Sequence, residues 1–233
     1  MNPWLKILSK EPYVLKNDKK LIDAFNIKTK SVDYTIDYSI PPEPFIGDIH
    51  NSEIYLLGLN PGLVRRNDGV IMEKEFLKQK PLFKKELLRN LRQEIKNYPF
   101  LFLNPKFSVA EGSKYWMSHL VNQLKKEVSE VNLQKISKKI CLVEYFPYHS
   151  TKFKEMKSSL ESQKFQFEII RNAIKKNKLV IILRSKKLWQ NQIKELNENK
   201  TNIIYLKNPQ SIYISRNNLK NPSDYDKIKK ILI

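Results

Sequence analysis

The sequence predicts an α/β protein, a three-layer α-β-α sandwich with a central four-stranded parallel sheet. Four short, continuous apolar runs are typical of strands that are covered on both faces: 54–59, 140–146, 179–183 and 202–206. Between these runs lie stretches in which apolar residues recur three or four positions apart, the spacing of amphipathic helices. Strands that alternate with helices favour a parallel sheet with helices on both sides.

The helical spacing identifies the elements that should cover the sheet. Ser223 is expected to cap the last helix, with Asp226 in its first turn. The apolar positions of the predicted helices are, in order, Phe83, Leu87, Leu88, Leu91 and Ile95; Trp116, Leu120 and Leu124; Ile169, Ile170, Ala173 and Ile174; Trp189, Ile193 and Leu196; and Tyr225, Ile228 and Leu232.

Residues 1–50 precede the first predicted strand and are expected to form an N-terminal arm packed on one α/β domain, residues 51–233. The arm ends in "IPPEPFIGDIH", whose prolines disfavour regular structure. Its apolar residues, among them Trp4 and Phe25, would be poorly placed in a free tail.

The composition excludes several classes of protein. No run is long and apolar enough to span a bilayer, and the N-terminus is too charged for a signal peptide. The single cysteine, Cys141, rules out an intrachain disulfide and a cysteine-based metal site. His50, His119 and His149 are scattered, and the last two are interpreted as structural. We therefore expect a cytosolic monomer without metal or organic cofactor.

The charge favours a polyanionic partner. There are 43 lysines and arginines against 24 acidic residues, a net charge of +19. Such a field attracts nucleic acid, so we expect DNA, single- or double-stranded, as the partner. A compositional bias toward lysine, asparagine and isoleucine is the alternative, but it explains the excess of bases over acids less well.

The loops that follow the predicted strands carry the polar residues. In a parallel sheet they meet at one rim, where open α/β sheets place their sites. The first run stops at Asn60-Pro61-Gly62, and the last is followed by Asn208-Pro209. Each could be a simple turn. Side by side on one rim, they indicate a site.

The two Asn-Pro loops resemble the motifs of the uracil-DNA glycosylase superfamily. "GLNPG" at 58–62 is similar to the first motif, closest to that of the mismatch-specific and single-strand-selective branches. "NPQS" at 208–211 is similar to the second motif, with Gln210 as an extra residue. The resemblance covers roughly residues 44–233.

The resemblance implies roles for four residues. Asn60 would orient the attacking water, and Asn208 would donate to the base carbonyl as it becomes anionic. Gly58 would allow the base to approach the backbone. Phe102, in a Phe-x-x-Pro spacing that the family shares, would stack on the extruded base, although a purely core role is the alternative.

Glu144 is where the sequence departs from the family. The single-strand-selective branch has an asparagine at this strand end, and its amide reads the base. An ionised carboxylate only accepts hydrogen bonds, so it would repel O4 of uracil and favour the N4 amine of a cytosine-type base. The alternative is a strand-end glutamate paired with a lysine.

Residues that flank the motifs are expected to contact DNA. Arg65 and Arg66 follow the first motif, and ordinary solvated charges are the alternative for them. Serine hydroxyls would bind phosphate, and apolar side chains would enter the gap left by the flipped nucleotide, unless they simply pack in the core. The predicted set is Arg65, Arg66, Ser211, Ile212, Tyr213 and Ser215.

Together these features predict a monofunctional DNA glycosylase that flips a uracil or a modified cytosine-type base and leaves an abasic site, in DNA repair or in defence against phage DNA. The alternative is a DNA-binding module of the same fold without chemistry. A basic enzyme acting on nucleotides is disfavoured, because the chain lacks a P-loop and has only 5 glycines.

Overall fold

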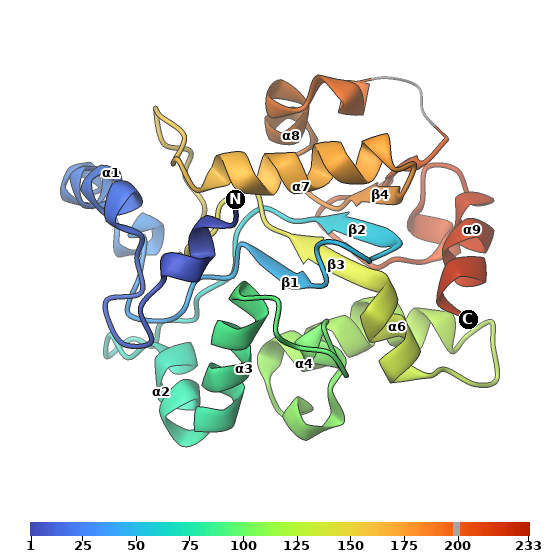
Figure 1. The fold of residues 1–233 in the computed structure, drawn as a ribbon, viewed down its shortest axis with the longest axis horizontal. Coiled ribbons are helices and arrows are strands. Elements are labelled where there is room, and N and C mark those ends of the chain that lie inside the picture. The colour runs from blue at the N-terminus through green and yellow to red at the C-terminus, as the bar shows by residue number, and fades with distance from the viewer. Residues whose placement is uncertain (198–200) are drawn as a thin grey trace.

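The computed structural model describes residues 1–197 and 201–233 and has a five-stranded mixed sheet at its centre (Figure 1). The strands are β1 (Phe45–Gly47), β2 (Ile54–Leu57), β3 (Ile140–Val143), β4 (Leu179–Ile182) and β5 (Ile203–Tyr205), in the order β1-β3-β2-β4-β5. Strands β2 to β5 are parallel, which confirms the four predicted strands and their direction. Each is a little shorter than its apolar run, so the last apolar residues of each run belong to the rim.

The fifth strand, β1, has no counterpart among the predicted strands. It pairs antiparallel with β3 at the edge of the sheet, with Phe45 opposite Val143. The segment that contains the prolines at 41, 42 and 44 is irregular, as expected, but the proline-rich stretch ends just before Phe45, where the strand begins. Edge strands tolerate neighbouring prolines, because one side of the strand needs no ladder hydrogen bonds. The sheet is therefore mixed and five-stranded, where the sequence predicts four parallel strands.

Helices cover both faces of the sheet (Figure 1). Alternate strand residues point to opposite faces, so Leu56 packs into one buried cluster and Leu57 into the other. The helices of the first cluster are α2 (Met72–Gln79), α3 (Pro81–Leu91), α4 (Glu111–Trp116), α5 (Asn122–Leu124), α6 (Leu133–Lys139) and α9 (Asp224–Leu232). Those of the second are α1 (Lys16–Lys28), α7 (Gln163–Lys175) and α8 (Lys186–Gln192), and α3 adds Leu88 and Leu91 to it.

The helices follow the predicted spacing with local differences. Helix α3 ends at Leu91 rather than near Ile95, because Gln93 adopts a positive φ of 60°. The segment predicted around Trp116 contains a π-helical turn between α4 and α5. Ser223 precedes α9 but makes no capping bond; its hydroxyl donates to Asn221 instead. None of the described helices has the length and apolar character needed to cross a membrane.

The N-terminal segment packs against the second cluster. Trp4 and Tyr13 are almost fully buried there. The hydroxyl of Tyr148 accepts from the Leu15 amide at 3.1 Å and donates to the Asp18 carboxyl at 2.8 Å. These bonds connect α1 to the loop that follows β3.

Gly47 is a sensitive point of the edge strand, and we expect Gly47→Ala to lower the free energy of unfolding by more than about 2 kcal/mol. Its φ is 124°, and a β-carbon would lie 2.6 Å from the Ile140 carbonyl oxygen and 2.8 Å from the Cys141 Cα. Both are backbone atoms of a central strand and cannot turn aside. In urea denaturation, Gly62→Ala is the control, because nothing lies within 4 Å of its added carbon. Equal losses in the two variants would contradict this account.

Candidate active site

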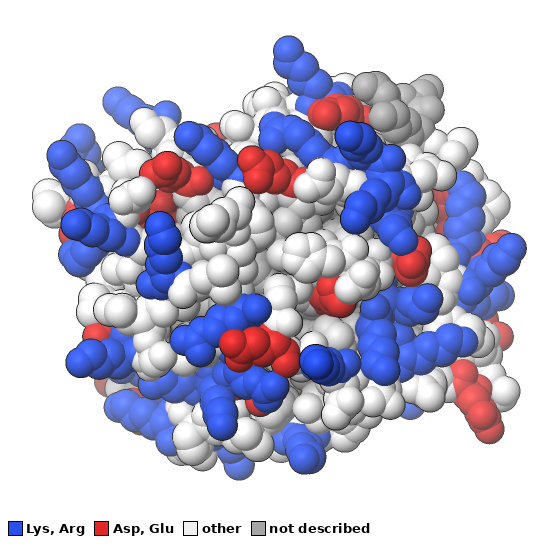
Figure 2. All heavy atoms as spheres, in the orientation of Figure 1, with Lys and Arg blue, Asp and Glu red and all other residues white. Residues whose placement is uncertain are grey.

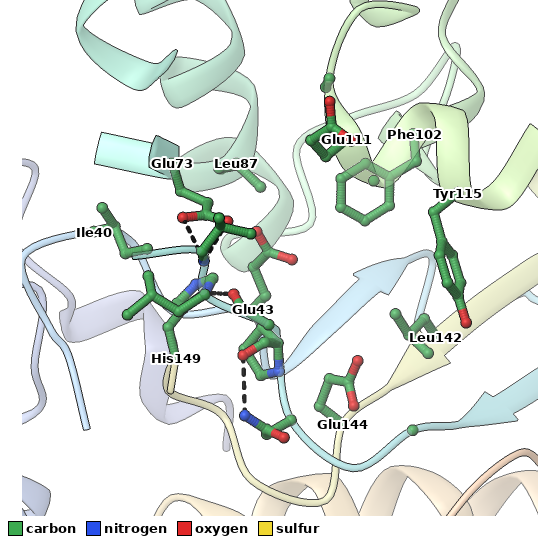
Figure 3. Close-up of a pocket in the computed structure, with 18 of the residues that line it drawn as sticks. Ile40, Glu43, Glu73, Leu87, Phe102, Glu111, Tyr115, Leu142, Glu144 and His149 are labelled. Carbon is green, nitrogen blue, oxygen red and sulfur yellow. Dashed lines mark hydrogen bonds between the residues drawn. The ribbon is translucent and has the colours of Figure 1, made fainter. Parts of the chain in front are cut away.

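The carboxyl ends of the parallel strands border a cavity of about 1030 Å³ (Figure 3). Asn60 follows β2, Glu144 follows β3 directly and Arg184 follows β4, and all three line the cavity. Phe102 and Tyr115 line it from the side of α4. The site therefore lies where open α/β sheets place ligands.

Asn60 is held on a rigid turn. Its Nδ2 lies 3.1 Å from the Ser150 hydroxyl and 3.1 Å from the Pro61 carbonyl oxygen. Its Oδ1 accepts no hydrogen bond from any residue that the structure describes, so it remains able to bind water or substrate. His149 fastens the same turn, with its ring nitrogens 2.9 Å from the Gly62 oxygen and 3.0 Å from the Pro41 oxygen. His149 thus has the structural, hydrogen-bonded position that the sequence predicts.

The side chain of Glu144 is only 8% exposed and forms part of the cavity wall. A β-carbon at residue 58 would lie 2.1 Å from Glu144 Oε2, so Gly58 gives the carboxyl its space. Oε2 has no hydrogen-bond partner, and the carboxyl forms no ion pair with any described residue. The alternative of a lysine pair is therefore wrong for the described part of the chain. Gln166 holds the backbone here by donating to the Glu144 carbonyl at 2.7 Å.

The environment of Glu144 favours its neutral form. Burial raises its pKa to about 8, and the like charge of Glu43 adds to this. Arg184 and the backbone amide of Leu59 act in the opposite direction. A neutral carboxyl has an O–H donor as well as an acceptor, which an ionised carboxylate lacks.

Phe102 belongs both to the core and to the cavity wall. It lies on a 3₁₀ turn, Leu101–Leu103, and its ring packs 6.3 Å from that of Phe83. A β-carbon at residue 112 would lie 2.4 Å from this ring, so Gly112 makes room for it. The sequence left two roles open for Phe102, a core residue or a pocket residue. In the structure Phe102 is both buried and part of the cavity wall.

Asn208 follows β5 on the same rim as Asn60, but it is exposed and does not line the cavity. The side-chain Oδ1 of Asn208 accepts from the backbone amide of Gln210 at 3.0 Å. The backbone amide of Asn208 donates to Oδ1 of Asn218. Strand β4 lies between β2 and β5, so the two Asn-Pro loops are separated by one strand. The predicted donation from Asn208 to a base would require this loop to move.

The other residues of the second loop have different environments. Ile212 is 6% exposed and lines the cavity, whereas Tyr213 is 37% exposed. The ring of Tyr213 stacks on His119 at 4.2 Å, and His119 stacks on Tyr115 at 3.9 Å. Of the two residues predicted to enter DNA, only Tyr213 is accessible. The predicted phosphate ligands Ser211 and Ser215 are partly exposed.

Both arginines of the first loop have acidic partners. Arg65 lies 3.5 Å from Asp37 and is largely covered, and Arg66 pairs with Asp68. Their charges are therefore partly neutralised within the protein. Figure 2 shows lysines and arginines spread over one face, with acidic side chains between them. Among the described residues, no group of three or more histidine, cysteine, aspartate or glutamate side chains could hold a metal ion.

Among the cavity residues that the sequence did not single out are Glu43, Tyr115 and Arg184. Arg184 directly follows a predicted strand, and that position was the only available signal. Burial raises the pKa of Tyr115 to about 12, against the effect of Arg184, so its hydroxyl stays a donor. Glu43 sits among prolines and gave no sequence signal for the cavity.

No family model, curated protein or solved structure matches this chain. The resemblance to the uracil-DNA glycosylase superfamily therefore stays a prediction based on the two motifs and the Phe-x-x-Pro spacing.

Folding stability should report the protonation of Glu144. Its pKa is raised from 4.5 to about 8, so the folded protein binds this proton more tightly than the unfolded chain. Between these values the unfolded carboxyl ionises while the folded one does not, and stability falls as the pH rises. Glu144→Gln cannot ionise. The free energy of unfolding of Glu144→Gln should therefore rise relative to that of the unmodified protein across this window, by up to roughly 1–3 kcal/mol.

The measurement is urea denaturation of both proteins at several pH values. Glu111→Gln is the control, because Glu111 is exposed and already paired with Lys114 at 2.7 Å. Parallel stability curves for the unmodified protein and Glu144→Gln would show that Glu144 is ionised in the fold.

Proposed function

We propose that the protein is a monofunctional DNA glycosylase that hydrolyses the N-glycosidic bond of a flipped base and leaves an abasic site. The observation that carries the proposal is the cavity at the carboxyl rim. The Glu144 carboxyl, whose Oε2 has no partner, and the free amide oxygen of Asn60 both border it, and the ring of Phe102 forms its opposite side. An edge-reading group, a water-orienting group and a stacking face are what excision of a base requires.

The chemistry can be assigned to these side chains. A flipped base would lie against Phe102 with its polar edge toward Glu144. Asn60 Oδ1 would accept from a water molecule and direct it to the sugar carbon, whose oxocarbenium-like character requires only a weak nucleophile. Asn208 would join this set only if the 208–213 loop closes over bound DNA. In the free protein, its exposed position at the rim fits a first contact with the strand.

The neutral form of Glu144 widens the substrate class expected from sequence. A neutral carboxyl can accept from N4 and donate to N3 of a cytosine-type base. It can equally donate to O4 and accept from N3–H of uracil. Once ionised, it can only accept, so it keeps the contact with N4 of cytosine or with N3–H of uracil and loses its donation to N3 or O4. We therefore propose both uracil and modified cytosines as substrates near neutral pH, with weaker recognition of both at higher pH.

The competing proposal is a DNA-binding module of the same fold that has lost its chemistry. The exposed position of Asn208 is the observation in its favour. Repair of cellular DNA and defence against phage DNA both fit a glycosylase, and the nature of the released base would distinguish them. With a net charge of +19, DNA is the proposed partner in either case.

Loss of the Asn60 amide should remove base excision but not DNA binding. We expect Asn60→Ala to lower the single-turnover rate by about 100-fold or more, because orienting the water matters mainly in the transition state. The assay is alkali cleavage of abasic sites in DNA of varied base content. Asn67→Ala, an exposed asparagine in the following loop, is the matched control. Excision by Asn60→Ala at the unmodified rate would exclude the mechanism.

Base release should depend on pH through Glu144. As the pH rises through about 8, the carboxyl loses its O–H donor, so release of both uracil and a cytosine-type base should fall. The expected loss is about 5- to 150-fold, the equivalent of one bidentate base contact. Glu144→Gln should abolish this pH dependence. The same fall in rate in Glu144→Gln as in the unmodified protein would exclude Glu144 as the base-reading residue.

A further inference from the structure

The cavity contains a second carboxyl that is absent from both motifs, that of Glu43. It comes from the proline-rich end of the N-terminal arm, just before β1 and outside the range that the resemblance covers. In Figure 3 Glu43 and Glu144 reach into the same space, which Phe102 borders from the other side. Two carboxyls in one cavity invite different roles, since one environment can hold a proton while the other remains basic.

The backbone holds Glu43 firmly in place. Its amide donates to the Pro147 carbonyl at 3.0 Å, and the Glu144 amide donates to the Pro44 carbonyl at 3.0 Å. The Pro41 carbonyl is bound by His149, whose other ring nitrogen binds Gly62 in the Asn60 turn. Prolines at 41, 42 and 44 restrict the backbone on both sides. Glu43 is thus fixed to the same turn that carries Asn60.

Of the three other carboxyls of the cavity, two are already engaged and the third, Glu144, is held in the wall. Glu73 accepts from the Val64 amide at 2.9 and 3.0 Å, and Glu111 is exposed and paired with Lys114. Glu144 is buried against Gly58. Within the described part of the chain, no hydrogen bond or ion pair engages the Glu43 carboxyl, and the residue is only partly buried. It is the carboxyl best able to receive a proton from a water in the cavity.

We propose that Glu43 is the general base of the reaction, a catalytic residue outside the two motifs. This inference rests on the proposed glycosylase function. Glu43 takes one proton from the water that Asn60 orients, while the water oxygen bonds to the sugar carbon. The bond from that carbon to the base nitrogen breaks, and its electron pair stays on the base. The proton then passes to the departing base, so that water is consumed and base and abasic DNA are released.

The surroundings of Glu43 define the pH at which it can act. Burial raises its pKa above the ordinary value for glutamate; the neighbouring His149 lowers it and Glu73 raises it. The remaining charged or titratable side chains of the cavity are Glu144, Glu111, Lys114, Tyr115 and Arg184. Because only the ionised form accepts a proton, the excision rate should fall as the pH decreases through this raised pKa.

The test compares single-turnover base release by the unmodified protein, Glu43→Gln and Glu43→Asp over a range of pH, with DNA binding measured separately. Glu43→Gln should lower the rate by about 100-fold or more near neutral pH and lose the acid limb of the profile. Its affinity for DNA should stay unchanged. Glu130→Gln, which changes an exposed carboxyl outside the cavity, is the matched control and should retain both the rate and the profile.

Each outcome has a distinct meaning. If the unmodified protein releases base and Glu43→Gln does so at the same rate, the role of Glu43 is excluded and the glycosylase function stands. If the unmodified protein releases no base from any DNA, both proposals fail. Thermal melting will show whether Glu43→Gln folds. If it does not, the acid limb of Glu43→Asp decides: a displaced limb supports the role, and an unchanged limb excludes it.

Discussion

The site depends on the close approach between the carboxyl of Glu144 and the backbone of Gly58. Strands β2 and β3 are adjacent, with Leu57 opposite Val143, so the residues that follow them are held at a fixed spacing. A side chain at residue 58 would collide with the carboxyl at 2.1 Å. Trp189 donates to the Gly58 carbonyl at 2.8 Å and Gln166 holds the Glu144 backbone, so neither partner can withdraw. The sheet itself therefore places an unpartnered carboxyl in the cavity wall.

The same device recurs across the cavity, where Gly112 makes room for the ring of Phe102. Neither glycine has a positive φ. Because neither glycine has a side chain, each leaves space for a neighbour that the sequence predicts to contact the base. Gly58 leaves space for the carboxyl of Glu144, and Gly112 leaves space for the ring of Phe102. A substitution at either glycine should therefore disturb the site more than a substitution at its rim.

The sequence was informative where the signal was local. Continuous apolar runs predicted the four parallel strands. Strand-end positions predicted that Asn60 and Asn208 would face a common cleft, but only Asn60 lines the cavity, together with Glu144. It failed where distant segments meet. The short strand β1 follows prolines that indicated irregular structure, and the partner of Arg65, Asp37, lies in another segment. The raised pKa of Glu144 could not be predicted, because it arises from burial and from Glu43, a neighbour only in the fold.

Release of a free base from DNA is the central property expected of the cavity. Mass spectrometry of the small molecules freed from uracil-containing DNA and from DNA rich in modified cytosines tests this most directly. We expect a free pyrimidine base without sugar or phosphate, and a polymer that retains its backbone until alkali is added. Release of nucleosides or nucleotides, or complete retention of every base, would contradict it.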